Sequence, residues 1–279
     1  MNITEHSLVE RHHDRRDLVA NVLNKRRLAL FQSMTDAFGE KLSAEELDIH
    51  FTHMPARYWQ RATDASVRRH LELIHEFFAR LGASDHAGTS CIVHWYHVPD
   101  RGITTVEICT WDRLGLLAKV AGAFAAVGLN ILRADIFTRA DNVVLDVFEV
   151  SEPSDHHVRN EARFKQMAAV LAGALKPGGS LPHITATRLA TTTVPEVGFD
   201  ASRDNSQTAM TVEADDRVGL LYNIFTALAR CDVNIAHAII TTNAGRAGDV
   251  FYLTDSFGRE IRDTARFDHI CALVIGALV

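Results

Sequence analysis

The chain has 279 residues, of which 47% are hydrophobic and 23% are charged, as in ordinary globular proteins. The formal net charge of −6 argues against nucleic acid and anionic membranes as partners. No hydrophobic run approaches the ~20 residues of a membrane span. The first residues lack a signal-peptide core. The four cysteines form no Cys-x-x-Cys pair, so we expect a reducing, cytoplasmic setting. From the length we expect about two domains, or three.

Residues 1–88 are predicted to form a helical N-terminal region. Hydrophobic residues recur there at a helical spacing, and Ser43 with Glu46 forms a capping box. The predicted helices span residues 17–38, 43–51 and 63–81. Between the last two, residues 57–59 are expected to form a basic and aromatic turn that anchors packing. Residues 82–89 are small and turn-forming, which predicts a linker.

One stretch of the remaining chain occurs twice. The first copy is Trp111 to Leu117 and the second is Asp215 to Leu221. Each copy follows a predicted strand and opens a predicted helix, and each helix is followed by an Asn-Ile pair. Adding 104 to a residue number in the first copy gives its partner in the second, for example 112 + 104 = 216. A period of this length indicates two duplicated domains rather than a solenoid.

Each copy is predicted to be β-β-α-β-β-α. The strands are expected at 91–98, 103–110, 130–138 and 143–150, then at 195–200, 207–214, 233–242 and 249–255, with a further strand at 183–189. The helices are expected at 114–127, 154–175, 218–230 and 262–279. The first strand of each copy replaces the last strand of an ordinary ferredoxin-like unit. The predicted fold class is therefore α+β, with two helices covering one face of each antiparallel sheet.

Each strand-to-helix corner has the chemistry to hold a small anion. Asp112 and Asp216 are expected to cap the helices by accepting hydrogen bonds from first-turn N–H groups. Gly115 and Gly219 lack a Cβ, so backbone or ligand can come close. A helix N-terminus also offers free donors and partial positive charge to a carboxylate. Asp-x-x-Gly is equally an ordinary capped turn, and it is the duplication that favours a binding site.

Other motifs do not indicate catalysis, and we predict no catalytic residue, no metal ligand and no cofactor. His94 and His97 point to opposite faces of a predicted strand, which makes them poor joint ligands. No phosphate loop, dinucleotide fingerprint or nucleophile elbow occurs. Arg133 and His237 hold equivalent positions near the corners. Either could contact a ligand, but exposed positions on the sheet are the simpler expectation.

The duplicated residues resemble ACT domains, which are small modules that bind amino acids or similar metabolites. The shared pattern is a strand, Asp-x-x-Gly-Leu-Leu, a helix and an Asn-Ile return. More narrowly, residues 15–279 are similar to the C-terminal part of the bacterial bifunctional PII uridylyltransferase/uridylyl-removing enzymes. The likeness is carried by residues 54–58 with His70, and by 197–200, 216–222 and 249–255. The expected domains are the helical region 1–88, a first ACT domain at 89–190 and a second at 191–279.

The catalytic motifs of that family are not found in this chain. The family's nucleotidyltransferase domain needs Gly-Ser followed by Asp-x-Asp to hold Mg²⁺, and no Asp-x-Asp occurs. Its uridylyl-removing domain needs spaced His, His-Asp and Asp ligands. The only His-Asp is at His13 and Asp14, in a short polar segment. The resemblance therefore implies the regulatory part without the catalytic parts.

In that family the ACT repeats are taken to sense glutamine, and the resemblance implies a ligand site at each corner. The implied contacts are Asp112, Arg113, Gly115, Leu116, Leu117, Asn130 and Ile131 in the first copy, and Asp216, Arg217, Gly219, Leu220, Leu221, Asn234 and Ile235 in the second. Backbone donors suit an α-carboxylate, aspartate suits an α-ammonium group, and asparagine suits an amide. Whether the two copies pair within one chain or across a homodimer stays open.

The leading hypothesis is a cytoplasmic, non-catalytic regulatory protein of nitrogen metabolism. It would bind a small amino acid, glutamine first, at its ACT domains and signal to a protein partner. The alternative is a divergent uridylyltransferase-related enzyme with an unrecognised active site in the helical region. A third, weaker hypothesis is that the repeats only dimerise and have lost the ligand site.

Overall fold

The structure is a computed structural model that describes residues 4–39, 41–82, 90–152, 161–182, 193–200 and 207–279. By internal contacts the chain divides into two compact units: Met1–Glu76 with Arg139–Asp141, and Phe77–Thr138 with Asn142–Val279. The predicted linker beyond Gly82, the start of the helix at 154, the strand at 183–189 and the turn at 201–206 lie outside the described residues. The predicted domain boundaries at 88/89 and 190/191 also fall there, and they stay predictions.

The helical unit is built from α1 (Thr4–Phe38), α2 (Ala44–His53), α3 (Ala56–Arg61) and the first part of α4 (Asp64–Gly82). The predicted capping box is confirmed, because the backbone N–H of Glu46 donates to Ser43 Oγ at 3.1 Å while that of Ser43 donates to Glu46 Oε2 at 2.8 Å. Residues 57–59 differ from the prediction, since they lie in a short helix rather than a turn. Tyr58 and Trp59 are buried there, as expected of a packing anchor.

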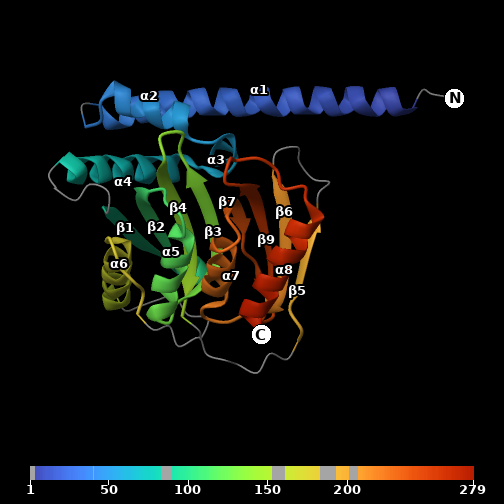
Figure 1. The fold of residues 1–279 in the computed structure, drawn as a ribbon. Helices are drawn as coiled ribbons and strands as arrows, with labels where there is room; N and C mark the ends of the chain where they lie inside the picture. Colours follow the sequence, from blue (N-terminus) through green and yellow to red (C-terminus); the bar gives the residue numbers. More distant parts are fainter. Residues whose placement is uncertain (1–3, 40, 83–89, 153–160, 183–192, 201–206) are drawn as a thin grey trace. The chain divides into compact units, whose positions relative to one another are not determined.

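The second unit contains two α+β modules of the same design (Figure 1). The strands of the first are β1 (Cys91–Val98), β2 (Ile103–Trp111), β3 (Asn130–Thr138) and β4 (Val143–Ser151); its helices are α5 (Leu116–Ala126) and α6 (Glu161–Leu175), and a 3₁₀ turn, η2 (Pro99–Arg101), links β1 to β2. The strands of the second are β5 (Glu196–Asp200), β6 (Thr208–Asp215), β7 (Val233–Ile239), β8 (Thr242–Asn243) and β9 (Arg246–Asp255); its helices are α7 (Leu220–Ala229) and α8 (Thr264–Leu278).

The two sheets confirm the predicted permutation of the ferredoxin-like unit. Their strand orders are β1-β2-β4-β3 and β5-β6-β9-β7, and every pair is antiparallel. The strand that precedes each copy, β1 or β5, therefore pairs at the edge where a closing strand would otherwise lie. Both modules also share an irregularity in register, between Ile131 and Arg133 in β3 and between Ile235 and His237 in β7. The duplication thus extends to the details of strand pairing.

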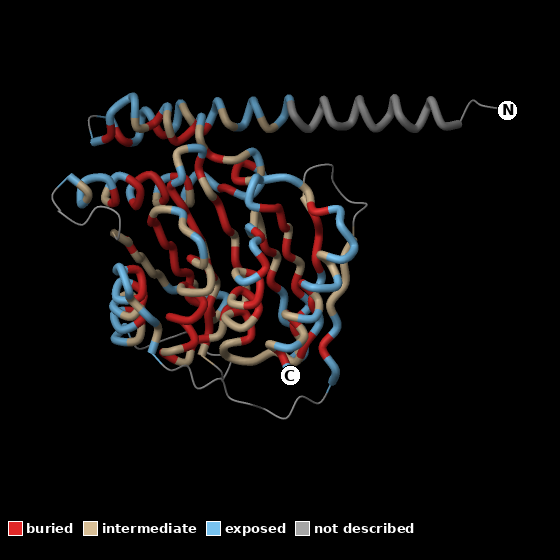
Figure 2. Tube along the Cα trace, in the orientation of Figure 1, coloured by how far each residue is buried: buried red, intermediate tan, exposed pale blue. Residues whose placement is uncertain are grey.

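The core of this unit lies between the helices and one face of the sheets (Figure 2). Alternate residues of β4, such as Val144, Phe148 and Val150, face Val120 and Phe124 of α5 in one buried cluster. The cluster continues into the second module, because α5 packs against α7 and β3 runs beside β7 (Figure 1). The question left open by the sequence is thereby answered: the two copies of one chain pair with each other.

Candidate functional site

The two strand-to-helix corners have the same backbone geometry. Helix α5 begins after Gly115 and helix α7 after Gly219, and these N-cap glycines have φ angles of 73° and 88°. Both values lie in the left-handed region, which residues with a Cβ adopt only with strain. The glycines are therefore required by the turn itself, before any ligand is considered.

The prediction that Asp112 and Asp216 cap the helices is wrong. Neither helix has a side-chain cap, because each aspartate lies three residues before the N-cap glycine and a left-handed turn intervenes. Instead, the backbone N–H of Asp112 donates to the Asn142 carbonyl at 2.8 Å, and that of Asp216 donates to the Gly245 carbonyl at 2.9 Å. The N–H groups of Leu116 and Leu220 donate to the carbonyls of Arg113 and Arg217 at 3.1 Å, and the next N–H groups of each first turn have no side-chain cap.

Each corner faces the Asn-Ile strand of the other module, and the residues between them line two pockets. The first pocket is lined by Asp112, Arg113, Gly115, Leu116 and Leu117 of the first module together with Asn234 and Ile235 of the second. The second pocket is lined by Asp216, Arg217, Gly219, Leu220 and Leu221 together with Asn130 and Ile131. Every residue implied by the family resemblance thus lines one of these two pockets. The ligand-binding role of these residues remains a prediction.

The two pockets differ greatly in size. The first has a volume of about 380 Å³ and the second about 10 Å³. In the second pocket, Asn130 Nδ2 donates to Asp216 Oδ2 at 2.8 Å and draws the two walls together. Tyr222 also stands there at the position that Ala118 holds in the first pocket. A hydrogen bond and a larger side chain therefore close the second pocket.

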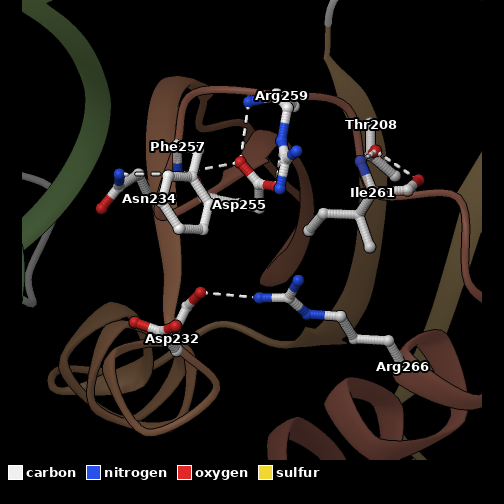
Figure 3. Close-up of polar contacts among 8 residues, drawn as sticks. All are labelled: Thr208, Asp232, Asn234, Asp255, Phe257, Arg259, Ile261 and Arg266. Carbon is white, nitrogen blue, oxygen red and sulfur yellow. Dashed lines mark hydrogen bonds and ion pairs between the residues drawn. The ribbon is translucent and has the colours of Figure 1, made fainter.

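The equivalent asparagine of the first pocket is held elsewhere (Figure 3). Asn234 Nδ2 donates to the Asp255 carbonyl oxygen at 3.4 Å, at the end of β9. The Asp255 carboxylate fixes the turn that follows, because it accepts from the backbone N–H groups of Phe257 and Arg259 and from Arg259 Nε at 2.8–2.9 Å. The backbone N–H of Arg259 is the main group that lowers the pKa of Asp255. This turn keeps the amide of Asn234 at the edge of an open pocket.

Two further acidic residues line the pockets, and the sequence analysis missed both. Asp146 lies in the first pocket and Asp249 in the second; the offset here is 103 because the second module has a shorter hairpin. Their exposed fractions are 0% and 1%. Each lies on the helix-covered face of its sheet, Asp146 between Val144 and Phe148 and Asp249 between Ala247 and Phe251. A charge at a buried position of an alternating strand is the signal that could have revealed them.

Burial changes the acidity of the pocket carboxyls. Desolvation raises the pKa of Asp249 to about 7, and the nearby charge of Asp216 raises it further, while a hydrogen bond from the backbone N–H of Thr241 opposes the rise. Asp249 Oδ2 has no hydrogen-bond partner among the described residues. Desolvation also raises the pKa of Asp112, against the backbone N–H and the charge of Arg113. A cationic group in either pocket would be favourable.

The two arginines of the motif are engaged beyond the pockets. Arg113 Nη1 donates to the carbonyl of Leu175 at 3.3 Å, and Arg217 Nη2 donates to the carbonyl of Leu278 at 2.9 Å. These carbonyls end α6 and α8, where a cation is favourable. The arginines therefore hold the C-terminal end of the second helix of each module, and each arginine also lines a pocket.

Arg133 and His237 are not part of either pocket. Arg133 Nε lies 3.3 Å from Asp135 Oδ2, and the His237 ring stacks on Tyr252 with centroids 5.4 Å apart. Both residues are half-buried rather than exposed. The described residues contain no group of three or more His, Cys, Asp or Glu side chains that could hold a metal ion. Among the described helices, none has the length and apolar character needed to cross a membrane.

A domain-family model and several known proteins match parts of this chain. Residues 104–163 match the model of the ACT domain. The chain is 31% identical over 249 residues to the bifunctional uridylyltransferase/uridylyl-removing enzyme of Bradyrhizobium diazoefficiens, covering 87% of this chain and 26% of that enzyme. It is 32% identical over 234 residues to the enzyme of the same name from Rhodospirillum rubrum, covering 80% and 24%. The chain thus spans about a quarter of the length of these curated relatives.

A solved structure is also similar, though more distantly. The aspartate kinase from Synechocystis matches 62% of this chain and 26% of its own, with 20% sequence identity and a TM-score of 0.35. The match to the domain model and the identity to the two enzymes confirm the predictions that residues 104–163 form an ACT domain and that the chain resembles the uridylyltransferase/uridylyl-removing enzymes. ACT domains are regulatory modules that bind small amino acids.

Proposed function

We propose that this chain binds a small amino acid, with glutamine as the first candidate, in the first pocket and signals to a protein partner in nitrogen metabolism. One observation carries the proposal: within one compact unit, the corner of the first module and the Asn-Ile strand of the second enclose a pocket of about 380 Å³. That volume suits a small metabolite. The glutamine and the link to nitrogen metabolism come from the family resemblance.

The pocket offers a complementary group for each part of such a ligand. The uncapped first turn of α5, at Leu117 and Ala118, provides backbone N–H donors for an α-carboxylate. Asp112 provides a carboxylate for the α-ammonium group. Asn234, from the other module, provides an amide for hydrogen bonds with a side-chain amide. The ligand would consequently contact both modules at once.

Contact with both modules gives a route from binding to regulation. A ligand that bridges the corner of α5 and strand β7 favours the arrangement in which these two elements are close. It shifts the balance between arrangements only by the difference in its affinity for them. A partner that meets one arrangement better than the other would then respond to the concentration of the amino acid.

A melting screen over the standard amino acids tests the proposal. A ligand present at about 100 times its Kd should add about 2.7 kcal/mol to the free energy of unfolding, which is a clear rise in Tm. Asp112→Ala should abolish the rise, because it removes a carboxylate of the pocket. A wild-type Tm that no amino acid raises would contradict the proposal, and a rise that survives Asp112→Ala would place the site elsewhere.

No observation in the described residues favours the alternative of an enzyme with its active site in the helical unit. One polar cluster there consists of His50, Tyr58 and His70, with Tyr58 Oη 3.3 Å from His50 Nε2 and 2.9 Å from His70 Nδ1. All three are buried. Desolvation, aided by the charges of His70 and Arg139, lowers the pKa of His50 well below its ordinary value. These are the properties of polar groups that support a core.

A further inference from the structure

We infer that the side-chain amide of Asn130 is an internal competitor of the ligand: it occupies Asp216 in the second pocket, so that the chain binds one amino acid rather than two. The inference rests on the proposed function. It gives the asparagine of each module a regulatory role, because the position of its amide decides whether the facing corner is open to a ligand.

The hydrogen bond between Asn130 and Asp216 takes the place of a contact with the ligand. Asn130 Nδ2 donates to Asp216 Oδ2 at 2.8 Å, from a strand of one module to the corner of the other. A contact of the same kind, from an N–H group to an aspartate, is the one proposed for the ammonium group of the ligand at Asp112. The volume that remains in the second pocket, about 10 Å³, has room for about one water molecule. The second corner is therefore satisfied from within the chain.

In the first pocket the equivalent amide is bound elsewhere (Figure 3). Asn234 Nδ2 donates to the carbonyl of Asp255 at 3.4 Å. The Asp255 carboxylate fixes the turn after β9, since it accepts from the backbone N–H groups of Phe257 and Arg259. A distance of 3.4 Å is long for an N–H to oxygen bond, so the bond is weak. A bond to an ionised carboxylate is stronger, and a loosened turn would allow Asn234 to exchange one for the other.

The two modules restrain their asparagines differently. Asn130 and Asn234 hold equivalent positions in β3 and β7. One residue beyond their partners in the neighbouring strands stand Glu152 in the first module and Asp255 in the second. Glu152 Oε1 lies 3.8 Å from Arg163 Nε of α6, whereas the Asp255 carboxylate binds the turn that follows it. The residue that holds one amide away from its corner thus has different contacts in the other module.

The second pocket has the groups of a ligand site behind the bond to Asn130. Asp216, Gly219 and the first turn of α7 repeat the corner of the first pocket. Asp249 also lines the pocket and is 1% exposed, and its Oδ2 has no hydrogen-bond partner among the described residues. A buried carboxyl oxygen beside a pocket is favourable for a cationic group. Removing the competing amide should therefore uncover a second amino-acid site.

Counting bound ligand molecules tests the inference. Equilibrium dialysis of the whole chain with labelled glutamine is expected to give one bound molecule per wild-type chain. Tyr222→Ala gives the second pocket the side chain that Ala118 provides in the first, and this variant should still bind one molecule because Asn130 remains. Adding Asn130→Ala should raise the number to two. Two molecules with Tyr222→Ala alone, or one with the double variant, would overturn the inference.

A matched control lies beside Tyr222. Asn223 is on the same helix, α7, and does not belong to the lining of the second pocket. Asn223→Ala in the Tyr222→Ala background removes the same amide group as Asn130→Ala and should leave one bound molecule. If another amino acid raises Tm more than glutamine does, that amino acid replaces glutamine in every measurement.

A second measurement concerns the first pocket and keeps Tyr222. Asp255→Asn loosens the turn and releases the amide of Asn234 toward Asp112, which lines the same pocket. The Kd for glutamine should rise about tenfold, because the ligand then competes with a hydrogen bond to a carboxylate. Adding Asn234→Ala should cancel this rise, so that the double variant binds as tightly as Asn234→Ala alone. Additive losses would show that Asp255 acts on stability only, and would overturn the role of the amide.

The outcomes separate the inference from the function on which it rests. If no amino acid binds wild-type protein, the proposed function fails and the inference fails with it. If wild-type protein binds two molecules, or if the variant lacking both Tyr222 and Asn130 binds one, only the inference is overturned. If Tyr222→Ala does not fold, the measurements on Asp255 and Asn234 decide.

Discussion

The ionisation of Asp249, which lines the second pocket, makes the stability of the fold depend on pH. Its pKa is raised to about 7 in the folded protein, mainly by desolvation, so the folded state holds this proton more tightly than the unfolded state does. Stability therefore falls as pH rises between the ordinary pKa of aspartate and about 7, and this contribution levels off above that value. The group destabilises the fold most at alkaline pH and least in acid.

Replacing Asp249 by asparagine should remove this dependence. The difference in Tm between Asp249→Asn and wild type is expected to grow in favour of the variant from about pH 5 to about pH 8, because only the wild type must ionise a buried carboxyl. Thermal melts at matched ionic strength measure this difference in Tm. Because both proteins share all other titrating groups, the effects of those groups cancel in the difference. A difference that is independent of pH would show that Asp249 titrates near its ordinary value.

Among single residues, the sequence predicted part of the lining of each pocket, but it did not predict the hydrogen bonds of Asp112 or the position of Asp146. The motif and its repeat located Asp112, Gly115 and Asn234, which the structure brings to one pocket. The capping role of Asp112 was wrong, because the left-handed glycine adds a turn that a linear motif does not display. Asp146 was missed because it belongs to a strand far along the chain, and only the sheet brings it under the corner.

At the scale of elements, the left-handed corner at the start of α5 has a measurable cost. A Cβ added at Gly115 would have nothing within 4 Å, so Gly115→Ala tests the backbone conformation alone. The variant should lose about 1–2 kcal/mol, which is the penalty of a left-handed residue with a side chain. Urea melts measure the loss.

The matched substitution is Gly173→Ala in the last turn of α6. A Cβ there also has nothing within 4 Å, but the residue is helical, so alanine should stabilise the fold by about 0.5–1 kcal/mol. The two variants are therefore expected to change stability in opposite directions. Equal or greater stability of Gly115→Ala would refute the requirement for glycine at the corner.

The closing of the second pocket could not be predicted from the pattern of elements. The two corners have equivalent motifs, so the sequence predicts the same kind of site at both. What separates them is a contact between modules, Asn130 to Asp216, and one change of side-chain size, from Ala118 to Tyr222. The size change is visible in the sequence, but its effect depends on where the neighbouring module lies.

At the scale of the whole molecule, the duplication accounts for the architecture of the second unit. Periodicity predicted both modules and the permuted strand, because each buried face leaves its own alternating pattern. It placed the start of the first helix at residue 17, whereas α1 begins at Thr4. The residues before it are mostly polar in sequence, so no hydrophobic period marks them.

No single motif predicted that the two copies pair with each other. It depends on the continuous buried cluster that α5 and α7 share and on the adjacency of β3 and β7. Because both walls of the first pocket belong to the same chain, a second copy of the protein is not needed to complete it. The first pocket is thus formed within one chain.

Amide hydrogen exchange, measured with and without the amino acid that most raises Tm, tests whether a ligand in the first pocket contacts both modules. Slower exchange on binding is expected at residues 112–118 and at 233–236 together, because both segments line that pocket. Residues 216–222 and 130–131, around the closed second pocket, should change less. Protection confined to one module, or to the helical residues 43–75, would show that the ligand does not bridge the two modules.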